Sequence, residues 1–316
     1  MNLQKKEYIS IKGKKKVVNA VVVEGKNIVV RGKFIKIAFV KDEVCDNGIA
    51  TPETIIDKLK AIRIADIFTF DQKLPETAPM FPYFYVWDNL AVLEVKSFKH
   101  WWNVQIGNDA RRMVRKAEKA GVVVKATPLT DEMVIGIKRI YDESPIRQGK
   151  PFWHYKKDFE TVKKENSTYL DRSEFIGAYF QNELIAFNKL FYTDNRADQI
   201  QLIAKLAHKD KSPINALISK AVEICSEKRI SYLTYGKYHY RNKTTDSLSD
   251  FKKRNGFEKI EIPRYYVPLS HKGKIAIFLR LYKGPADFLP FFILQNLLAF
   301  RAMVYSLIFS SKQKGP

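Results

Sequence analysis

The sequence predicts an α+β protein in which helices flank a mixed, mostly antiparallel sheet. Short runs rich in β-branched residues, which favour strands, alternate with longer segments whose apolar residues recur at helical spacing. At 316 residues the chain is long for one domain and suits two, each with its own core. Both halves mix strands and helices in a similar way, so we expect two structurally related halves without a sequence repeat.

The first half is expected to begin with an arm and to continue as a small α/β domain. Residues 1–16 are rich in lysine and lack periodicity, which is typical of a flexible basic arm. Residues 17–120 form the predicted N-terminal half. It starts with three β-branched strands separated by Gly25 and Gly32. Pro52 then stands at the first helical position of a short helix, and two more strands follow.

A long basic helix is predicted over residues 97–120, with Gly121 ending it. Its spacing places Arg111, Arg115 and Lys119 on one stripe. This stripe is either a phosphate-binding surface or a solvated cationic face, and the pattern leaves both open.

Residues 121–284 form the predicted second half, and residues 285–316 an apolar helix with a short basic tail. The second half starts with a strand and an amphipathic helix. A loop comes next. It is followed by three strands, a helix, a strand, a short helix and a last strand. The predicted ranges are 122–127, 130–142, 175–180, 184–192, 199–206, 213–225, 231–236, 247–255 and 262–269.

Bulky hydrogen-bonding side chains crowd the loop at residues 143–158. Loops that carry such residues often contact ligands, so we expect a substrate-binding segment here. A well-packed aromatic loop is the alternative. The candidate residues are Arg147, Gln148, Trp153, His154 and Tyr155.

An anion-binding site is predicted where a helix begins at Ser212-Pro213, directly after a strand. Ser at the N-cap and Pro at the first helical position are start signals. The free amides of the first turn and the cations before it would then stabilise an anion, although any capped helix offers such amides. The candidate cofactor-binding residues are Lys205, His208, Lys209, Lys211, Ile214, Asn215 and Ala216.

Aromatic and basic residues gather at the ends of the last two strands. Ligands collect outside strand ends in open α/β sheets, so Tyr235, Lys237, Arg264 and Tyr265 are predicted to bind substrate. Tyrosines that only seal the core are the alternative.

The order of elements from Val122 onward resembles the GNAT acyltransferase fold, and Phe251–Phe257, FKKRNGF, resembles its final helix. GNAT enzymes usually carry a Gly-rich loop for the coenzyme A pyrophosphate, whereas residues 208–216 contain no glycine. Lys252 also stands where many of these enzymes have a proton-donating tyrosine. With the basic helix ending RKAEKAG and the Tyr235-Gly236 strand end, the chain looks more like the Fem-type aminoacyl transferases. This resemblance implies two GNAT-like halves side by side, aminoacyl-tRNA as donor and a peptidoglycan precursor as acceptor.

The resemblance also implies catalytic residues. Transfer from an ester to an amine develops negative charge on the carbonyl oxygen, and a fixed cation stabilises it. Lys252 is placed for this role by the resemblance. Asp246 is the candidate acceptor of the amine's proton, although Thr244–Ser247 is also a plain helix cap.

Charge and cysteine usage limit the partners and the compartment. The 55 Lys and Arg residues against 34 Asp and Glu give a net charge of +21, which favours a polyanionic partner such as tRNA or coenzyme A. The 2 cysteines have no metal-ligand spacing, so neither a disulfide framework nor a metal site is predicted. No signal peptide is expected, and the predicted place is the cytoplasm.

The apolar stretch at residues 288–309 has three possible roles. It packs on the domain or on a second subunit, lies as an interfacial helix on anionic lipid, or spans a membrane. Contact with an anionic membrane on its inner face would suit an enzyme acting on a lipid-linked precursor.

We therefore expect an enzyme: an acyltransferase that moves an aminoacyl or acyl group onto an amine of a cell-envelope, peptidoglycan or glycan precursor. The acyl donor is aminoacyl-tRNA or acetyl-coenzyme A, and no tightly bound cofactor is expected. One alternative is an acetyl-coenzyme A-dependent N-acetyltransferase of a small molecule or sugar. The other is a non-catalytic basic protein that binds RNA or tRNA on the same fold.

Overall fold

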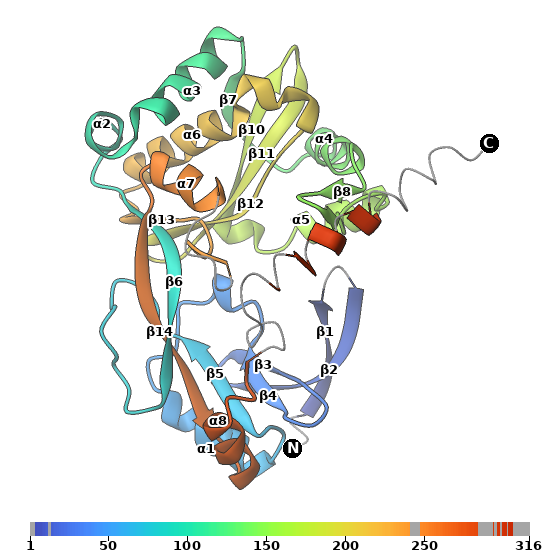
Figure 1. Ribbon diagram of the computed structural model, residues 1–316, viewed down its shortest axis with the longest axis vertical. Coiled ribbons are helices and arrows are strands. Elements are labelled where there is room, and N and C mark those ends of the chain that lie inside the picture. Colours follow the sequence, from blue (N-terminus) through green and yellow to red (C-terminus); the bar gives the residue numbers. More distant parts are fainter. Residues whose placement is uncertain are drawn as a thin grey trace, which may run out of the picture. The chain divides into compact units, whose positions relative to one another are not determined.

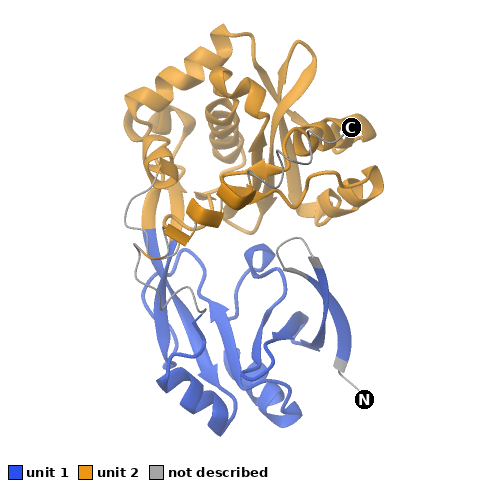
Figure 2. Ribbon diagram, turned by 45° about the vertical axis from the view of Figure 1, so that its right-hand side comes forward, with its two compact units in different colours: residues 1–89, 260–289 blue, residues 90–259, 290–316 orange. Residues whose placement is uncertain are grey.

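The computed structural model describes residues 4–11, 14–240 and 247–283, together with residues 293, 296, 297, 299–301 and 303–305. The chain divides into two compact units (Figure 2). Unit 1 comprises residues 1–89 and 260–289, and unit 2 comprises residues 90–259 and 290–316.

This division differs from the predicted boundary at residues 120 and 121. The unit boundaries fall inside two strands, β6 (Tyr85–Glu94) and β14 (Glu258–Pro268), which run from one unit into the other. Unit 1 is therefore completed by a segment from the far end of the chain. Patterns along the sequence do not reveal such a completion, because it depends on strand pairing between distant residues.

In unit 1, six neighbouring strands of the sheet follow one another in the order β1-β2-β3-β4-β5-β14 (Figure 1). Neighbouring strands are antiparallel except β4 and β5, which are parallel. A single apolar core joins α1 to the sheet, with Phe68, Phe70 and Tyr265 among its buried members. The remaining bounds are β1 (Gln4–Ile11), β2 (Lys14–Val23), β3 (Lys26–Arg31), β4 (Ile37–Val40), η1 (Glu43–Cys45), α1 (Pro52–Ile62), β5 (Ile67–Asp71) and α8 (His271–Phe278).

The predicted basic arm is wrong for most of its length. Strand β1 pairs antiparallel with β2, from Gln4 opposite Val21 to Ile11 opposite Lys14. The hairpin places β1 at an edge of the sheet. Lysines are common on edge strands because their charge discourages pairing with other chains, so a Lys-rich composition does not exclude a strand.

Unit 2 contains a sheet with the order β6-β13-β12-β11-β10-β7 (Figure 1). All its pairs are antiparallel except β12 and β13. The bounds are α2 (Phe98–His100), η2 (Trp101–Gln105), α3 (Asn108–Lys119), β7 (Val123–Thr127), α4 (Asp131–Asp142), β8 (Ile146–Arg147), β9 (Lys150–Pro151), α5 (Phe159–Asn166), η3 (Leu170–Arg172), β10 (Ser173–Phe180), β11 (Glu183–Tyr192), β12 (Arg196–Ala204), η4 (Leu206–Lys211), α6 (Pro213–Glu227), β13 (Tyr232–Thr234) and α7 (Ser247–Arg254).

Helices cover both faces of the unit 2 sheet. Ile176 of β10 packs with α3 and α6 in one core, whereas its neighbour Phe175 packs with α4 and α5 in another. Adjacent residues of a strand point to opposite faces, so these two cores lie on the two sides of the sheet. The mixed, mostly antiparallel sheet flanked by helices is therefore the predicted fold class.

The predicted long helix at residues 97–120 is broken. A π-helical turn, η2, ends at Gln105, Ile106 is extended, and α3 starts after Gly107. The amide of Gly107 donates to the carbonyl of Arg254 at 2.8 Å, and a Cβ on Gly107 would lie 3.2 Å from that oxygen. The break thus lets α3 approach the end of α7.

The apolar C-terminal stretch, predicted as a helix, lies largely outside the described residues. Those of its residues that are described are helical, and Ile293, Leu297, Phe300 and Met303 are between 37% and 62% exposed. Among the helices that the structure describes, none combines the length and the apolarity needed to cross a membrane.

Candidate active site

A buried lysine marks the candidate active site in unit 2. Lys252 of α7 is fully buried, while its neighbours Lys253 and Arg254 are exposed. Its Nζ donates to the carbonyl oxygen of Lys237 at 2.5 Å. A lysine is rarely buried this far unless its charge is held by partners, so the position is unlike that of a surface lysine.

Two tyrosine rings flank the ammonium group. The Nζ of Lys252 lies 4.8 Å from the ring centre of Tyr235 and 5.0 Å from that of Tyr240. Aromatic faces attract a cation through their quadrupole, which partly replaces the lost hydration. Burial raises the pKa of Tyr235 to about 12, so this tyrosine stays protonated near neutral pH.

The end of α7 is fixed by contacts from two other elements. The indole Nε1 of Trp101 donates to the carbonyl of Asn255 at 2.9 Å, and the side-chain Nδ2 of Asn215 donates to the Oδ1 of Asn255 at 3.1 Å. Asn255 and Asn215 are both buried. These bonds hold the last turn of α7 against η2 and α6, and so they position Lys252.

Asp246, the predicted proton acceptor, lies outside the described residues. The residue stands immediately before Ser247, where α7 begins. Its role stays a prediction.

Strands β12 and β13 part close to this region. They pair in parallel only from Arg196 opposite Tyr232 to Asp198 opposite Thr234. Beyond that point β12 continues to Ala204 beside β11, while the backbone after β13 bonds to Ala91 of β6. The turn η4 and the helix α6 follow β12, so the predicted anion-binding loop begins at the far end of β12.

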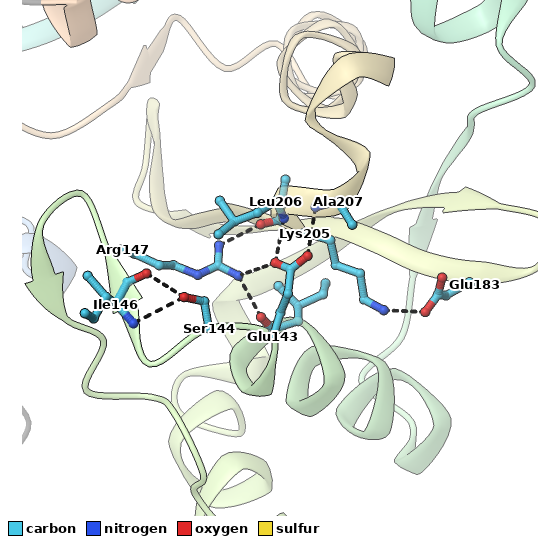
Figure 3. A network of polar contacts seen from close by, with 10 residues as sticks. Glu143, Ser144, Ile146, Arg147, Glu183, Lys205, Leu206 and Ala207 are labelled. Carbon is cyan, nitrogen blue, oxygen red and sulfur yellow. Dashed lines mark hydrogen bonds and ion pairs between the residues drawn. The ribbon is translucent and has the colours of Figure 1, made fainter. Parts of the chain in front are cut away.

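Two backbone amides of this loop donate hydrogen bonds to a carboxylate of the same chain (Figure 3). The amide of Leu206 donates to Glu143 Oε2 at 2.5 Å, and the amide of Ala207 donates to Oε1 at 2.8 Å. Successive backbone amides of this kind form an anion-binding site. Here the anion is the side chain of Glu143, at the C-terminal end of α4.

Arg147 completes this network (Figure 3). Its guanidinium donates to Glu143 at 3.1 Å, to the carbonyl of Ala204 at 2.6 Å and to the carbonyl of Ile140 at 2.7 Å. Burial lowers the pKa of Arg147 and the charge of Glu143 raises it. The predicted role of Arg147 in substrate binding is not supported by this placement, because both terminal nitrogens of its guanidinium are bonded within the protein.

Two of the predicted basic residues before α6, Lys205 and His208, lie beside a second carboxylate, that of Glu183. Lys205 is ion-paired with it, and His208 Nε2 lies 3.6 Å from its Oε2. The hydrogen bond from Lys205 holds the pKa of Glu183 below its usual range. Lys211 pairs with Asp210 at 3.2 Å, whereas Lys209 is exposed.

The start of α6 is partly as predicted. The helix begins at Pro213, but Ser212 has φ +53° and its side chain makes no capping bond. The amide of Asn215 donates to the carbonyl of Ser212 at 3.2 Å, Ala216 is buried and Ile214 is half-buried. The backbone amide of Asn215 is thus engaged internally, whereas the carboxylate of Glu143 is held by the amides of Leu206 and Ala207 in the preceding loop.

The other predicted residues of the substrate loop differ in how far they are buried. His154 stacks on Tyr141 with ring centres 4.4 Å apart, and burial lowers its pKa to about 4. Trp153 is 55% exposed, Gln148 is exposed and Tyr155 is half-buried. The aromatic loop is therefore packed at His154, while Trp153 and Gln148 remain available to a ligand.

The prediction for the last strand is wrong for Tyr265. This residue is fully buried in unit 1, its hydroxyl donates to Gln72 at 2.7 Å, and it accepts from the amide of Met80 at 2.9 Å. Arg264 also lies in unit 1, among carboxylates. Tyr235 and Lys237 are the two strand-end residues that the structure brings to Lys252.

Sequence patterns alone missed Glu143. Its spacing to Arg147 is that of a helical ion pair, which was a detectable signal. Its bonds to two amides more than 60 residues away were not detectable, since they depend on how α4 packs beside β12.

No protein-family model matches the sequence, and no curated protein matches it. Solved structures do resemble it. A C-terminal domain described as that of a lysylphosphatidylglycerol synthetase from Agrobacterium fabrum has a TM-score of 0.57 at 14% identity, over 83% of this chain and 87% of that one. FemX has a TM-score of 0.53 at 9% identity, over 87% and 90%. L-PGS from Bacillus licheniformis has a TM-score of 0.52 at 14% identity, over 87% and 88%.

At such low identity these likenesses concern the fold. The chain has a GNAT-like fold close to that of the Fem type, as the sequence predicts.

Proposed function

We propose that the protein is an acyltransferase that moves an aminoacyl group from aminoacyl-tRNA onto an amine of a cell-envelope, peptidoglycan or glycan precursor. The observation that carries this proposal is the fully buried ammonium group of Lys252, held beside the carbonyl of Lys237 on a GNAT-like fold. An enzyme with such an acceptor works in the cytoplasm, on the inner face of the membrane.

The reaction needs charge stabilisation more than acid chemistry. The neutral amine attacks the ester carbonyl carbon, an amide forms as the bond to the tRNA ribose oxygen breaks, and the proton lost by the amine ends on that oxygen as a hydroxyl. Negative charge develops on the carbonyl oxygen, where a pre-oriented cation is most effective in a site shielded from water. Lys252 supplies that cation. Its ammonium group already donates to the Lys237 carbonyl, 2.5 Å away, so the oxyanion competes with this carbonyl for the ammonium hydrogens. Asp246 is the proposed acceptor of the amine's proton.

The Glu143 network supports a donor other than coenzyme A. A pyrophosphate at the loop after β12 would use free backbone amides. Those of Leu206 and Ala207 already donate to Glu143, which would repel a phosphate. This favours a donor that is not held by a pyrophosphate at that loop.

A basic surface of unit 2 suits a tRNA donor. Arg112, Arg115, Lys116 and Lys119 are exposed on α3. This helix lies beside the start of α6, since the hydroxyl of Ser212 contacts the sulfur of Met113 at 3.3 Å. Cations along one helix can follow a phosphate backbone, and that binding weakens steeply with salt.

The test compares two adjacent lysines of α7 in a transfer assay with aminoacyl-tRNA and amine-bearing envelope precursors. Lys252→Ala is expected to lower kcat about 100-fold, as the loss of an oxyanion-stabilising donor does. Lys253→Ala, the exposed neighbour, is the matched control and is expected to keep full activity. Lys252→Met fills the same volume and separates a lost charge from a lost shape, with thermal unfolding confirming that each variant is folded. Unchanged turnover in folded Lys252→Met would contradict the mechanism.

A ligand experiment separates the alternatives. A ligand that binds only the folded state raises the unfolding temperature. Stabilisation by aminoacyl-tRNA together with transfer supports the proposal. Stabilisation by acetyl-coenzyme A instead supports an N-acetyltransferase, and tRNA binding without transfer to any amine supports a non-catalytic tRNA-binding protein.

A further inference from the structure

Helix α8 of unit 1 packs on its domain through small residues. Gly273 and Ala276 are buried, and a Cβ on Gly273 would lie 1.9 Å from the carbonyl oxygen of Asp66. Ser270 caps the helix by accepting from the amide of Gly273 at 3.0 Å, and its hydroxyl donates to Asp66 at 3.0 Å. The close contact needs glycine, so this face of α8 is fixed toward the domain.

The large apolar side chains of α8 consequently point outward. Ile275 is 59% exposed and Phe278 85%, and Leu279 and Leu281, just beyond the helix, are 52% and 48% exposed. Phe34, which is 84% exposed, is joined to the same surface because its carbonyl accepts from Lys272. Contiguous exposed apolar residues of this size mark an interaction site.

Cations surround these apolar side chains. Lys272, Lys274, Arg280 and Lys283 lie within the same stretch, and no Asp or Glu occurs between Glu261 and Asp287. The charge of this surface is therefore complementary to an anionic partner.

An open pocket of about 760 Å³ lies beside the helix. Its lining combines apolar side chains, among them Phe84, Val86 and Ile277, with the cationic side chains of Lys274, Arg280 and Lys283. Apolar walls with several cations fit a molecule that has a hydrocarbon part and a phosphate.

We propose that this α8 surface, formed by Phe34, Lys272, Lys274, Ile275, Phe278, Leu279 and Arg280, docks on a bilayer of anionic phospholipid. The apolar side chains insert between the headgroups and the cations contact lipid phosphates. The proposal goes beyond the proposed transfer reaction, because it assigns a membrane contact to unit 1, which holds none of the catalytic candidates.

The charge argues for lipid over the other occupants. A second copy of this chain would bring the same cations against each other, which is unfavourable. The chain's own apolar C-terminal stretch carries only Arg301 among residues 288–311 and no acid to pair with four cations.

The experiment measures binding of the full-length protein to vesicles of phosphatidylglycerol mixed with phosphatidylcholine, and to vesicles of phosphatidylcholine alone. We expect binding to the anionic vesicles that weakens with salt. Ile275→Ser with Phe278→Ser is expected to reduce the affinity about tenfold or more. Val104→Ser with Val123→Ser, at exposed valines of unit 2, is the matched control and is expected to bind as the unmodified protein does.

Charge removal provides the second variant, in case the serine variant does not fold. Lys274→Ala with Arg280→Ala is expected to lower the affinity for anionic vesicles about fivefold per cation. Absence of binding to anionic vesicles would overturn the proposal. So would unchanged binding by the folded α8 variants while Leu297→Ser with Phe300→Ser abolishes it, which would assign the contact to the C-terminal stretch. A loss of self-association without a loss of vesicle binding would assign the surface to a second copy.

Discussion

Each unit contains an arginine among carboxylates, and the two networks differ in their charge balance. In unit 2, Arg147 meets one carboxylate, that of Glu143, and two backbone carbonyls. In unit 1, Arg264 Nη2 lies 2.7 Å from Glu43, is ion-paired with Asp71, and its Nε lies 3.7 Å from Asp88. One cation balances one anion in the first network and faces three anions in the second.

The difference shows two uses of a buried arginine. The carboxylate of Glu143 also accepts from two amides, so the unit 2 network ties α4 to the loop after β12 and fixes backbone geometry. In unit 1 the surplus of negative charge makes the site sensitive to protonation. Burial and the charge of Glu43 raise the pKa of Asp71, Arg264 opposes both, and the result is a pKa of about 7.

Removal of Arg264 should have the largest effect. Arg264→Met leaves three carboxylates without the cation they share, and breaking a buried ion pair in this way destabilises by about 3–5 kcal/mol. Urea unfolding at pH 7 measures the loss, with Arg280→Met, at an exposed arginine, as the control. The deficit should shrink as the pH falls and the carboxylates protonate. A loss below about 1 kcal/mol would show that Arg264 does not hold the three acids together.

In the unit 2 network, the stability of Glu143 variants should depend on the hydrogen bonds that are lost more than on the charge that is lost. Glu143→Ala leaves two amides and Arg147 without their acceptor, which should lower the free energy of unfolding by about 2–3 kcal/mol. Glu143→Gln retains one carbonyl acceptor and should lose about half as much. Denaturant unfolding of the two variants tests this order. Equal losses would mean that the negative charge, not the amide bonds, stabilises the loop.

The comparison becomes sharper through the pH dependence of unit 1. A carboxyl whose pKa is raised on folding binds more protons in the folded state than in the unfolded state. Its stabilisation is complete below the unfolded pKa and is lost as the pH rises through the folded one. Between pH 4 and pH 7, stability should therefore fall by about 3 kcal/mol through Asp71, and Asp71→Asn should remove this slope. An unchanged slope in Asp71→Asn would assign the titration to another group.

The smallest expected effect has the opposite sign and belongs to unit 2. Burial lowers the pKa of His154 to about 4, so the unfolded state binds the proton more readily. Stability should then fall by about 2 kcal/mol as the pH drops from 7 to 5, and His154→Leu should remove this loss. Unfolding at pH 7 and pH 5 measures it. If the loss persists in His154→Leu, the stacking of His154 on Tyr141 is not its source.

Local patterns predicted what depends on neighbours in sequence. The strands β10, β11 and β12, the start of α6 at Pro213 and the order that ends with α7 and β14 are present as expected. The patterns failed where distant residues decide. Tyr265 was expected to bind substrate but is fully buried in the core, which was the stated alternative, and the predicted helix at 97–120 breaks where Gly107 meets Arg254.

The candidate site shows the same division. Lys252 was selected by its resemblance to a family pattern, but its burial beside Lys237 and two tyrosines was not foreseeable. A lysine followed by Lys253 and Arg254 on a short helix has the pattern of a surface residue. The first turn of α6 was expected to bind an anion. The amides that do so belong to the preceding loop, and their anion comes from α4.

By itself, the sequence determined most of the succession of strands and helices, because periodicity and turn chemistry act between residues close in the chain. Its resemblance to the Fem-type transferases indicated the GNAT-like fold. Only the tertiary structure decided which charges are balanced. Glu143 reaches Leu206, and Arg264 reaches Glu43 and Asp71, through packing between segments far apart in sequence. The energy of a buried charge depends on the partners and solvent within a few ångströms of it, and those are set by the fold.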